Sequence, residues 1–140
     1  MKATDLMIGD WVKCTDPRCE GHQVDLIDLG NEEVGLDGEI DNFENIIPIP
    51  LTPEIFEKSG FTLNEEENPI FTIRVYSLDA DDVAVIQRPK GGWKFMYGKA
   101  TDNQQNLFFG DGTFVCMPIQ YVHELQHALR LCGIDKEITL

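Results

Sequence analysis

Turn-forming residues interrupt this chain at short intervals, and they limit most of it to short strands. Asp16-Pro17 and Gly91-Gly92 mark loops, while Asp37-Gly38 supplies the positive φ angles of a type I′ hairpin turn. The segments between such breaks are short and rich in apolar residues, often with the alternation typical of strands. The sequence therefore predicts a mixed α+β fold in which antiparallel strands predominate.

The first fifty or so residues carry several strand signals. Strands are predicted at residues 11–14 and 23–29, followed by a hairpin over residues 34–40. Residues 46–51 are apolar, but Pro48 and Pro50 restrict them to an edge strand or an extended connector. Several short strands joined by tight turns predict a small SH3-like β-barrel, which we place at residues 1–52.

The rest of the chain is predicted to form an α+β subdomain over residues 53–140. Thr52 is placed to cap a short linking helix that begins at Pro53 and ends at Gly60. The charged segment at 65–69 (EEENP) predicts a break, and residues 70–117 predict an antiparallel β-meander. An amphipathic helix is expected over residues 119–132. The alternative is that both subdomains form one compact unit.

Charge and composition exclude some classes of function. The 140 residues are 42% hydrophobic, enough for a packed core, and carry a formal net charge of −14. This charge disfavours general nucleic-acid binding and binding to anionic membranes. The sequence shows neither a secretory signal pattern nor a bilayer-spanning apolar run, so we expect a cytoplasmic protein. We expect reduced cysteines, the last two of them in the core: Cys14, Cys19, Cys116 and Cys132.

Three short blocks of the sequence are distinctive. The first is residues 6–12 (LMIGDWV), and the second is residues 49–54 (IPLTPE) running on to Gly60-Phe61. The third is residues 121–123 (YVH) followed by Leu125-Gln126. With these blocks, spread over nearly its whole length, the chain resembles small uncharacterised proteins carried by phages and mobile elements of gut Bacteroidetes. Because no activity is assigned to this family, the resemblance implies a mobile-element origin without a particular chemistry.

Residues 123–127 read His-Glu-Leu-Gln-His, the H-E-x-x-H pattern of zinc metalloproteases. In such enzymes the two histidines bind Zn²⁺ and the glutamate deprotonates the metal-bound water. A catalytic zinc also needs a third protein ligand, and no candidate lies in a recognised pattern. The candidates are Cys116, Cys132, Asp135 and Glu137. In the resembling family, the positions of Glu124 and His127 are commonly amides.

The helical positions of these residues favour an accidental match to the motif. At about 100° per residue, one apolar stripe contains Val122, Leu125, Leu129 and Cys132. His123 and His127 lie almost opposite this stripe, together with Gln126 and Arg130. We therefore expect both histidines on a solvated face, with contact to a second layer as the alternative.

Cys14, Cys19 and His22 form a second zinc candidate within one loop. Structural zinc normally takes four ligands with closer cysteine spacing, so a fourth ligand such as Asp16 or His123 would be needed. The alternative interpretation is a hairpin loop with an exposed thiol.

A basic segment stands out in this acidic chain. Arg88, Lys90, Lys94 and Lys99 fall within twelve residues that contain no acid, interleaved with Trp93, Phe95 and Tyr97. Such a segment could dock an acidic partner or a nucleic acid. The alternative is that the aromatic side chains face the core while the lysines point outward and protect a β edge.

Two hypotheses about function follow. The preferred one is a non-enzymatic accessory or interaction protein of a phage or mobile element, with no cofactor and an unknown protein partner. The alternative is a zinc-dependent metallopeptidase or hydrolase that uses His123, Glu124 and His127, with zinc as its cofactor. No phosphate-loop, dinucleotide or nucleophile-elbow pattern supports another enzyme class.

Overall fold

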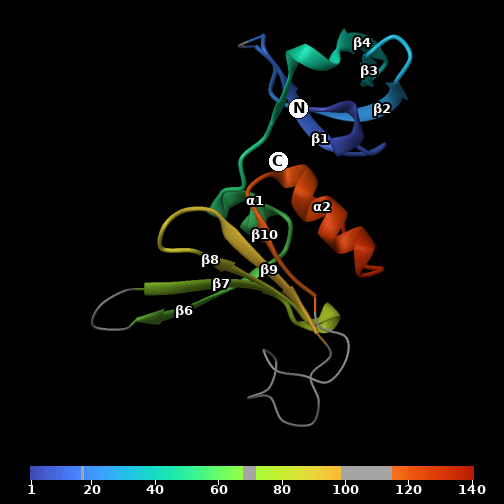
Figure 1. Cartoon of the computed structure of the whole chain (residues 1–140). Coiled ribbons are helices and arrows are strands. Elements are labelled where there is room, and N and C mark those ends of the chain that lie inside the picture. Colours follow the sequence, from blue (N-terminus) through green and yellow to red (C-terminus); the bar gives the residue numbers. More distant parts are fainter. Residues whose placement is uncertain (17, 68–71, 99–114) are drawn as a thin grey trace. The chain divides into compact units, whose positions relative to one another are not determined.

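The structure, a computed structural model, describes residues 1–16, 18–67, 72–98 and 115–140 (Figure 1). The chain divides into two compact units. Unit 1 contains Met1–Pro50 and Tyr121–Gln126, and unit 2 contains Leu51–Gln120 and His127–Leu140. Helix α2 (Val122–Leu131) therefore contributes its first half to unit 1 and its second half to unit 2. The sequence interpretation placed the division at residue 52 and assigned the whole helix to the second part.

Unit 1 is built around an antiparallel sheet in which, within the described residues, five strands follow the order β4-β3-β2-β1-β5. Its elements are η1 (Ala3–Asp5), β1 (Trp11–Cys14), β2 (His22–Asp28), β3 (Glu33–Leu36), β4 (Glu39–Asn42), η2 (Phe43–Asn45) and β5 (Ile46–Pro48). Strand β5 returns to pair with β1, with Lys13 opposite Ile47. No closed barrel is found in the described part of the chain, where the sheet is open between β4 and β5.

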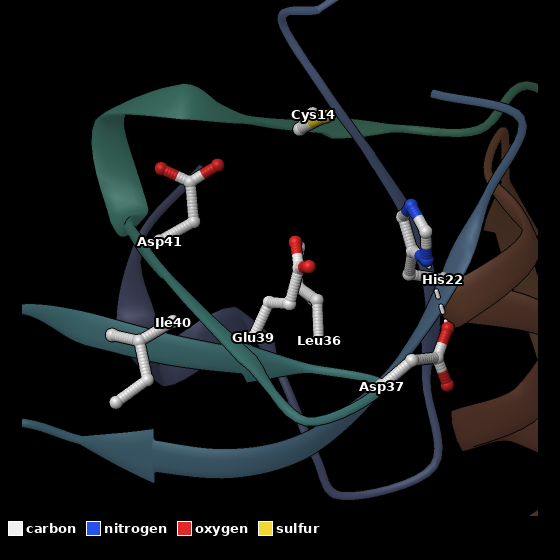
Figure 2. Close-up of a pocket in the computed structure, with 7 residues that line it drawn as sticks. All are labelled: Cys14, His22, Leu36, Asp37, Glu39, Ile40 and Asp41. Carbon is white, nitrogen blue, oxygen red and sulfur yellow. Dashed lines mark hydrogen bonds and ion pairs between the residues drawn. The ribbon is translucent and has the colours of Figure 1, made fainter. Parts of the chain in front are cut away.

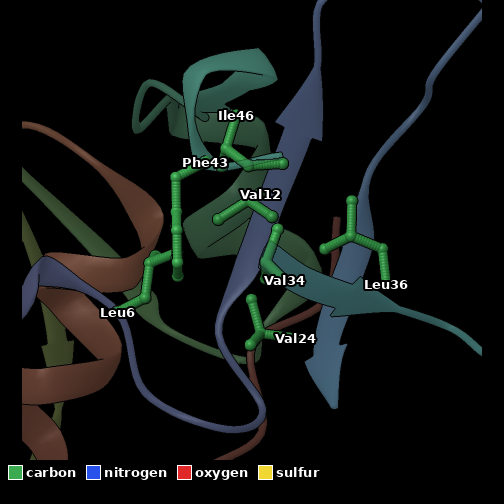
Figure 3. Packing of buried hydrophobic residues seen from close by; sticks show 7 residues of the cluster. All are labelled: Leu6, Val12, Val24, Val34, Leu36, Phe43 and Ile46. Atoms are coloured by element: carbon green, nitrogen blue, oxygen red, sulfur yellow. The ribbon is translucent and has the colours of Figure 1, made fainter. Parts of the chain in front are cut away.

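The core of unit 1 is a small apolar cluster on one face of this sheet (Figure 3). Its buried members are Leu6, Val12, Val24, Val34, Leu36, Phe43 and Ile46. They come from η2, from the segment before β1 and from every strand of the sheet except β4. Burial of each such side chain stabilises the folded state by about 1.5–3 kcal/mol relative to leaving it exposed. Because the cluster is small, the hydrogen bonds of the surrounding loops matter for how unit 1 is held together.

The β3–β4 hairpin has the turn that its sequence predicts. Asp37 and Gly38 both adopt positive φ angles, 50° and 88°, as a type I′ turn requires. The carboxylate of Asp25 in β2 reaches over Gly35 and accepts the N–H of Gly38 at 2.7 Å. A Cβ on Gly35 would collide with that carboxylate and with the Cβ of Leu26. Because position 35 is glycine, the Asp25 side chain of β2 has room to hydrogen-bond to the β3–β4 turn.

Unit 2 contains a second antiparallel sheet, in which the described strands follow the order β10-β9-β8-β7-β6. Its elements are α1 (Pro53–Lys58), β6 (Thr62–Glu67), β7 (Thr72–Leu78), η3 (Asp79–Asp81), β8 (Val83–Gln87), β9 (Trp93–Tyr97) and β10 (Val115–Ile119). Phe56 of α1 is fully buried and stacks on Tyr76 of β7, with ring centroids 4.8 Å apart. Phe61 and Trp93 also contact Phe56, at 5.2 Å and 4.8 Å. This aromatic group fixes α1 against the sheet.

Two sequence expectations about unit 2 are wrong in detail. Of the break expected at 65–69, residues 65–67 instead belong to strand β6, an edge strand of the described sheet that tolerates carboxylates, and residues 68–69 lie outside the described residues. Glu65 lies opposite Arg74 of β7 and forms an ion pair with it at 3.0 Å. The final helix begins at Val122, and Ile119 belongs to β10. The positions expected for α1 are confirmed: Thr52 is the N-cap residue, Pro53 begins the helix and Gly60 after its end has a positive φ of 82°, although the Thr52 side chain makes no capping hydrogen bond.

Candidate functional site

The His-Glu-Leu-Gln-His segment lies in helix α2, and its first residues are less exposed than expected. His123 is 6% exposed, and its ring stacks on that of Tyr121 with 5.9 Å between centroids. Gln126 is 8% exposed. The expectation of a solvated helix face is therefore wrong for His123 and Gln126. His127 is half-buried, and Arg130 is exposed.

The burial of Gln126 has a clear physical reason in unit 1. Its Oε1 accepts the N–H of Trp11 at 2.9 Å, and its Nε2 donates to the carbonyl oxygen of Gly9 at 3.0 Å. Backbone groups that leave water need such partners, and the loop ahead of β1 finds them in this amide. At Gln126 the polar face of the helix thus hydrogen-bonds to partly buried backbone groups of this loop instead of contacting water.

Glu124 has a structural role at the start of α2. Its Oε2 accepts the N–H of Tyr121 at 3.1 Å, which is the contact made by a glutamate at the third helical position of a capping box. This bond stabilises the helix start and requires no metal. Among the described residues, no group of three or more His, Cys, Asp or Glu side chains is placed to hold a metal ion. The zinc-hydrolase hypothesis therefore gains no ligand set from this part of the chain.

The four cysteines are free thiols in the structure. Cys116 is exposed and Cys132 is half-buried, so the expectation that both belong to the core is wrong for Cys116. Burial raises the pKa of the Cys132 thiol above its ordinary value, which makes it a poor nucleophile. Cys14 and Cys19 lie together in unit 1 and have a different environment.

Cys14, Cys19 and His22 are brought together, as their spacing suggested, with Asp37 as an additional partner. The N–H of Cys14 donates to Sγ of Cys19 at 3.0 Å, and Nδ1 of His22 lies 2.8 Å from Oδ2 of Asp37. The hydrogen bond to Asp37 raises the pKa of His22 above its ordinary value, against the opposing effect of desolvation. These residues converge at the end of β1, the start of β2 and the β3–β4 turn.

A cavity of about 260 Å³ opens beside this group of residues (Figure 2). It is lined by Cys14, His22, Leu36, Asp37, Glu39, Ile40 and Asp41. Three of these side chains are carboxylates, and the Asp41 carboxylate is held by Nδ2 of Asn45 at 2.7 Å. Among the lining residues, His22 supplies the one group that can carry positive charge. The cavity is therefore acidic, with an apolar wall at Leu36. We refer to it below as the acidic cavity.

Sequence reasoning missed the three carboxylates of the acidic cavity. A signal was present, because Glu39 and Asp41 are two residues apart and share one face if the strand predicted to end at Ile40 continues to Asp41. Their position opposite Cys14 and His22 depends on the register of β2, β3 and β4, which the sequence does not display.

The basic segment contributes exposed side chains from the β8–β9 hairpin of unit 2. Arg88, Lys90 and Lys94 are exposed, while Trp93 and Phe95 are 5% and 0% exposed. This alternation confirms that Trp93 and Phe95 face the core while these cations point outward. The expected protection of a β edge is wrong for Lys94, because β9 lies between β8 and β10 in the sheet. Lys99 lies outside the described residues.

No protein-family model, curated protein or solved structure matches this chain. In the described part of the chain, no helix is long and apolar enough to cross a membrane. The function must therefore be inferred from the residues and their geometry.

Proposed function

We propose that this protein is a non-enzymatic interaction protein that binds a basic segment of a partner protein through the acidic cavity of unit 1. The observation that supports this proposal is the convergence of Asp37, Glu39 and Asp41 on one cavity. Its volume of about 260 Å³ is below the roughly 300–1,000 Å³ of sites for drug-sized ligands. A single lysine or arginine side chain suits such a space, with its stem against Leu36 and its charged head among the carboxylates.

The surroundings of the cavity also favour a basic protein segment. The net charge of −14 attracts cationic partners over a long range and speeds their encounter. Strand β4, which supplies Glu39 and Asp41, is an edge strand of the described sheet. An extended segment can pair with such an edge through its main chain while one of its side chains enters a neighbouring pocket.

We also propose that unit 1 is related to the SH3-like barrels expected from the sequence. A meander of four strands, a 3₁₀ turn and a fifth strand that returns to β1 give the strand order of an SH3-like barrel. Barrels of this kind serve many different functions, so the fold alone does not identify a partner. The phage or mobile-element setting is supported only by the three sequence blocks described above.

Binding of a lysine-rich decapeptide, measured by isothermal titration calorimetry at low salt, tests this function. An acidic decapeptide serves as the negative control. Glu39→Gln should weaken binding about two- to fivefold, as expected for one partly exposed ion pair. The double variant with Asp41→Asn should lose roughly tenfold. The matched control is Glu54→Gln, which removes an exposed carboxylate from α1 in unit 2. Equal losses in Glu39→Gln and Glu54→Gln would refute a specific site.

A further inference from the structure

The loop between β1 and β2 brings the Cys19 sulfur against the backbone of Cys14, the last residue of β1. Asp16 shapes this loop, since its carbonyl oxygen accepts the N–H of Cys19 at 2.9 Å. Its carboxylate accepts the N–H of Arg18 at 2.9 Å. The resulting turn returns Cys19 to the end of β1, where Cys14 donates its N–H to the Cys19 sulfur at 3.0 Å.

The environment of the two sulfurs is unequal. Burial would raise the pKa of the Cys19 thiol, but hydrogen bonds from Cys14 and from the backbone of Gly21, together with nearby His22, lower it overall. The hydrogen bond to Cys19 instead raises the pKa of Cys14. Cys19 is thus the better thiolate of the pair, and Cys14 is the sulfur that stays protonated. His22 contacts Cys19 and is itself held by Asp37.

Access to the pair is open. Cys14 and Cys19 are both partly exposed, and Cys14 lines the acidic cavity. Within the described residues, no group of three or more His, Cys, Asp or Glu side chains is placed to hold a metal ion. Cys14, Cys19, His22 and Asp37 therefore do not form such a group. Two partly exposed cysteines, with the sulfur of Cys19 held 3.0 Å from the backbone nitrogen of Cys14 and favoured as a thiolate, are an arrangement suited to thiol–disulfide exchange.

We propose that Cys14 and Cys19 form a reversible dithiol–disulfide couple whose co-reactant is a small cationic disulfide. The Cys19 thiolate attacks one sulfur of the small disulfide, and the first small thiolate leaves with the proton held by His22. The Cys14 sulfur then attacks Cys19 Sγ in the mixed disulfide and expels the second small thiolate, which takes the Cys14 proton. Two protein thiols are oxidised to one disulfide, and the small disulfide is reduced to two small thiols.

The charge of the acidic cavity selects the co-reactant. The carboxylates of Glu39 and Asp41 repel an anionic disulfide such as oxidised glutathione and attract a cationic one such as cystamine. The preference for cystamine should shrink as salt is added, because the cavity is open to solvent. This inference does not depend on the partner binding proposed above, since the exchange needs only the small disulfide.

The test uses the full chain with Cys116→Ser and Cys132→Ser, so that the two remaining thiols are those of the pair. The protein is equilibrated with cystamine and cysteamine at several ratios, quenched with acid, and analysed by intact mass and peptide mapping. We expect loss of two hydrogens, a mapped Cys14–Cys19 link, and full return of both thiols on adding reductant. This measurement needs no substitution within the pair, so it does not depend on the folding of a site variant.

Two variants and one comparison complete the test. Cys14→Ser should accumulate the mixed disulfide on Cys19, and Cys19→Ser should react about tenfold more slowly, in line with its smaller thiolate fraction. Cystamine should react faster than oxidised glutathione at low salt. The proposal is overturned if only mixed disulfides form on the intact pair, or if both single variants react at the same rate. Stoichiometric zinc in the purified protein, released when the pair is oxidised, would also overturn it in favour of a metal site.

Discussion

Replacing Gln126 by glutamate should destabilise the protein in a pH-dependent way. The side chain keeps its size, and one oxygen can still accept the N–H of Trp11, now 2.9 Å from Oε1. In the wild-type protein, Nε2 of Gln126 donates to the carbonyl oxygen of Gly9 at 3.0 Å. In the variant, a carboxylate oxygen replaces Nε2, so an acceptor faces this carbonyl oxygen in place of a donor. Gln126 is 8% exposed, so water does not easily replace the lost bond.

The magnitude follows from these contacts. The partly buried carbonyl of Gly9 loses its 3.0 Å donor and keeps only the longer contact with Nε2 of Gln23 at 3.5 Å. Losing such a partner costs about 1–3 kcal/mol, and more when the group opposite the carbonyl is charged. We therefore expect Gln126→Glu to lose roughly 2–4 kcal/mol of unfolding free energy at pH 8. Protonation restores a donor, so the pKa of the introduced carboxyl is raised above its unfolded value of about 4.3. The stabilisation that the protonated carboxyl of residue 126 gives to the folded state is fully present below the unfolded pKa. It is lost as the pH rises through the folded pKa.

Urea unfolding of the wild type and the variant at pH 5 and pH 8, followed by tryptophan fluorescence, measures this effect. The difference between the two proteins at each pH removes the titrations that they share. Gln126→Leu is the matched control, because it removes both hydrogen bonds without adding a titratable group and should cost the same at both values of pH. A pH-independent loss in Gln126→Glu, or a loss below about 0.5 kcal/mol, would refute the reasoning.

Four further outcomes are expected. Leu125→Ala should cost about 2–5 kcal/mol in urea unfolding, since Leu125 is 0% exposed, whereas Leu131→Ala, at 69% exposure, should cost less than about 0.5. Gly35→Ala should cost about 1–3 kcal/mol by the same assay, because of the collision over the β3–β4 hairpin. Asp37→Asn keeps a residue suited to the type I′ turn but should lower the pKa of His22, measured by NMR titration. The stability that this ion pair adds should be present below pH 6.5, the ordinary pKa of His22, and vanish as the pH rises through its raised folded value. Adding EDTA should shift the melting temperature by no more than a few degrees; a larger drop would point to a structural metal.

The sequence predicts local structure well where one turn or one buried face decides it. The Asp37-Gly38 hairpin and the alternation of Trp93 and Phe95 in β9 follow from backbone preferences and from period-two burial. Strand β6 was missed because its carboxylates fit an edge strand, where pairing to Arg74 and β7 decides the conformation. The conformation of such a strand depends on the residues that pair with it in the folded protein, and a short window of sequence does not contain them.

The same limit explains the outcome for the candidate site. One apolar stripe on helix α2 predicted the buried Leu125 but left His123 and Gln126 on a face assumed to contact water. Polar side chains can be buried wherever a loop needs hydrogen-bond partners, and the hydrophobic periodicity of a sequence does not predict such burial. The grouping of Cys14, Cys19 and His22 was visible from spacing. Its completion by Asp37 required the fold of the β3–β4 hairpin.

The bonds between Gln126 and the loop ahead of β1 also have a consequence for synthesis on the ribosome. Trp11 and Gln126 are separated by 115 residues in the chain. At about 5–20 residues per second, the amide reaches its partner roughly 6–23 seconds after Trp11 has been made. During that interval the described strands of unit 1 can pair and Gly9 can donate its N–H to Val24, but the two hydrogen bonds from Gln126 to Trp11 and Gly9 are still missing. Nascent chains should therefore remain sensitive to proteases near residue 10 until translation has passed helix α2, and ribosome pausing upstream of that helix should lengthen the exposure.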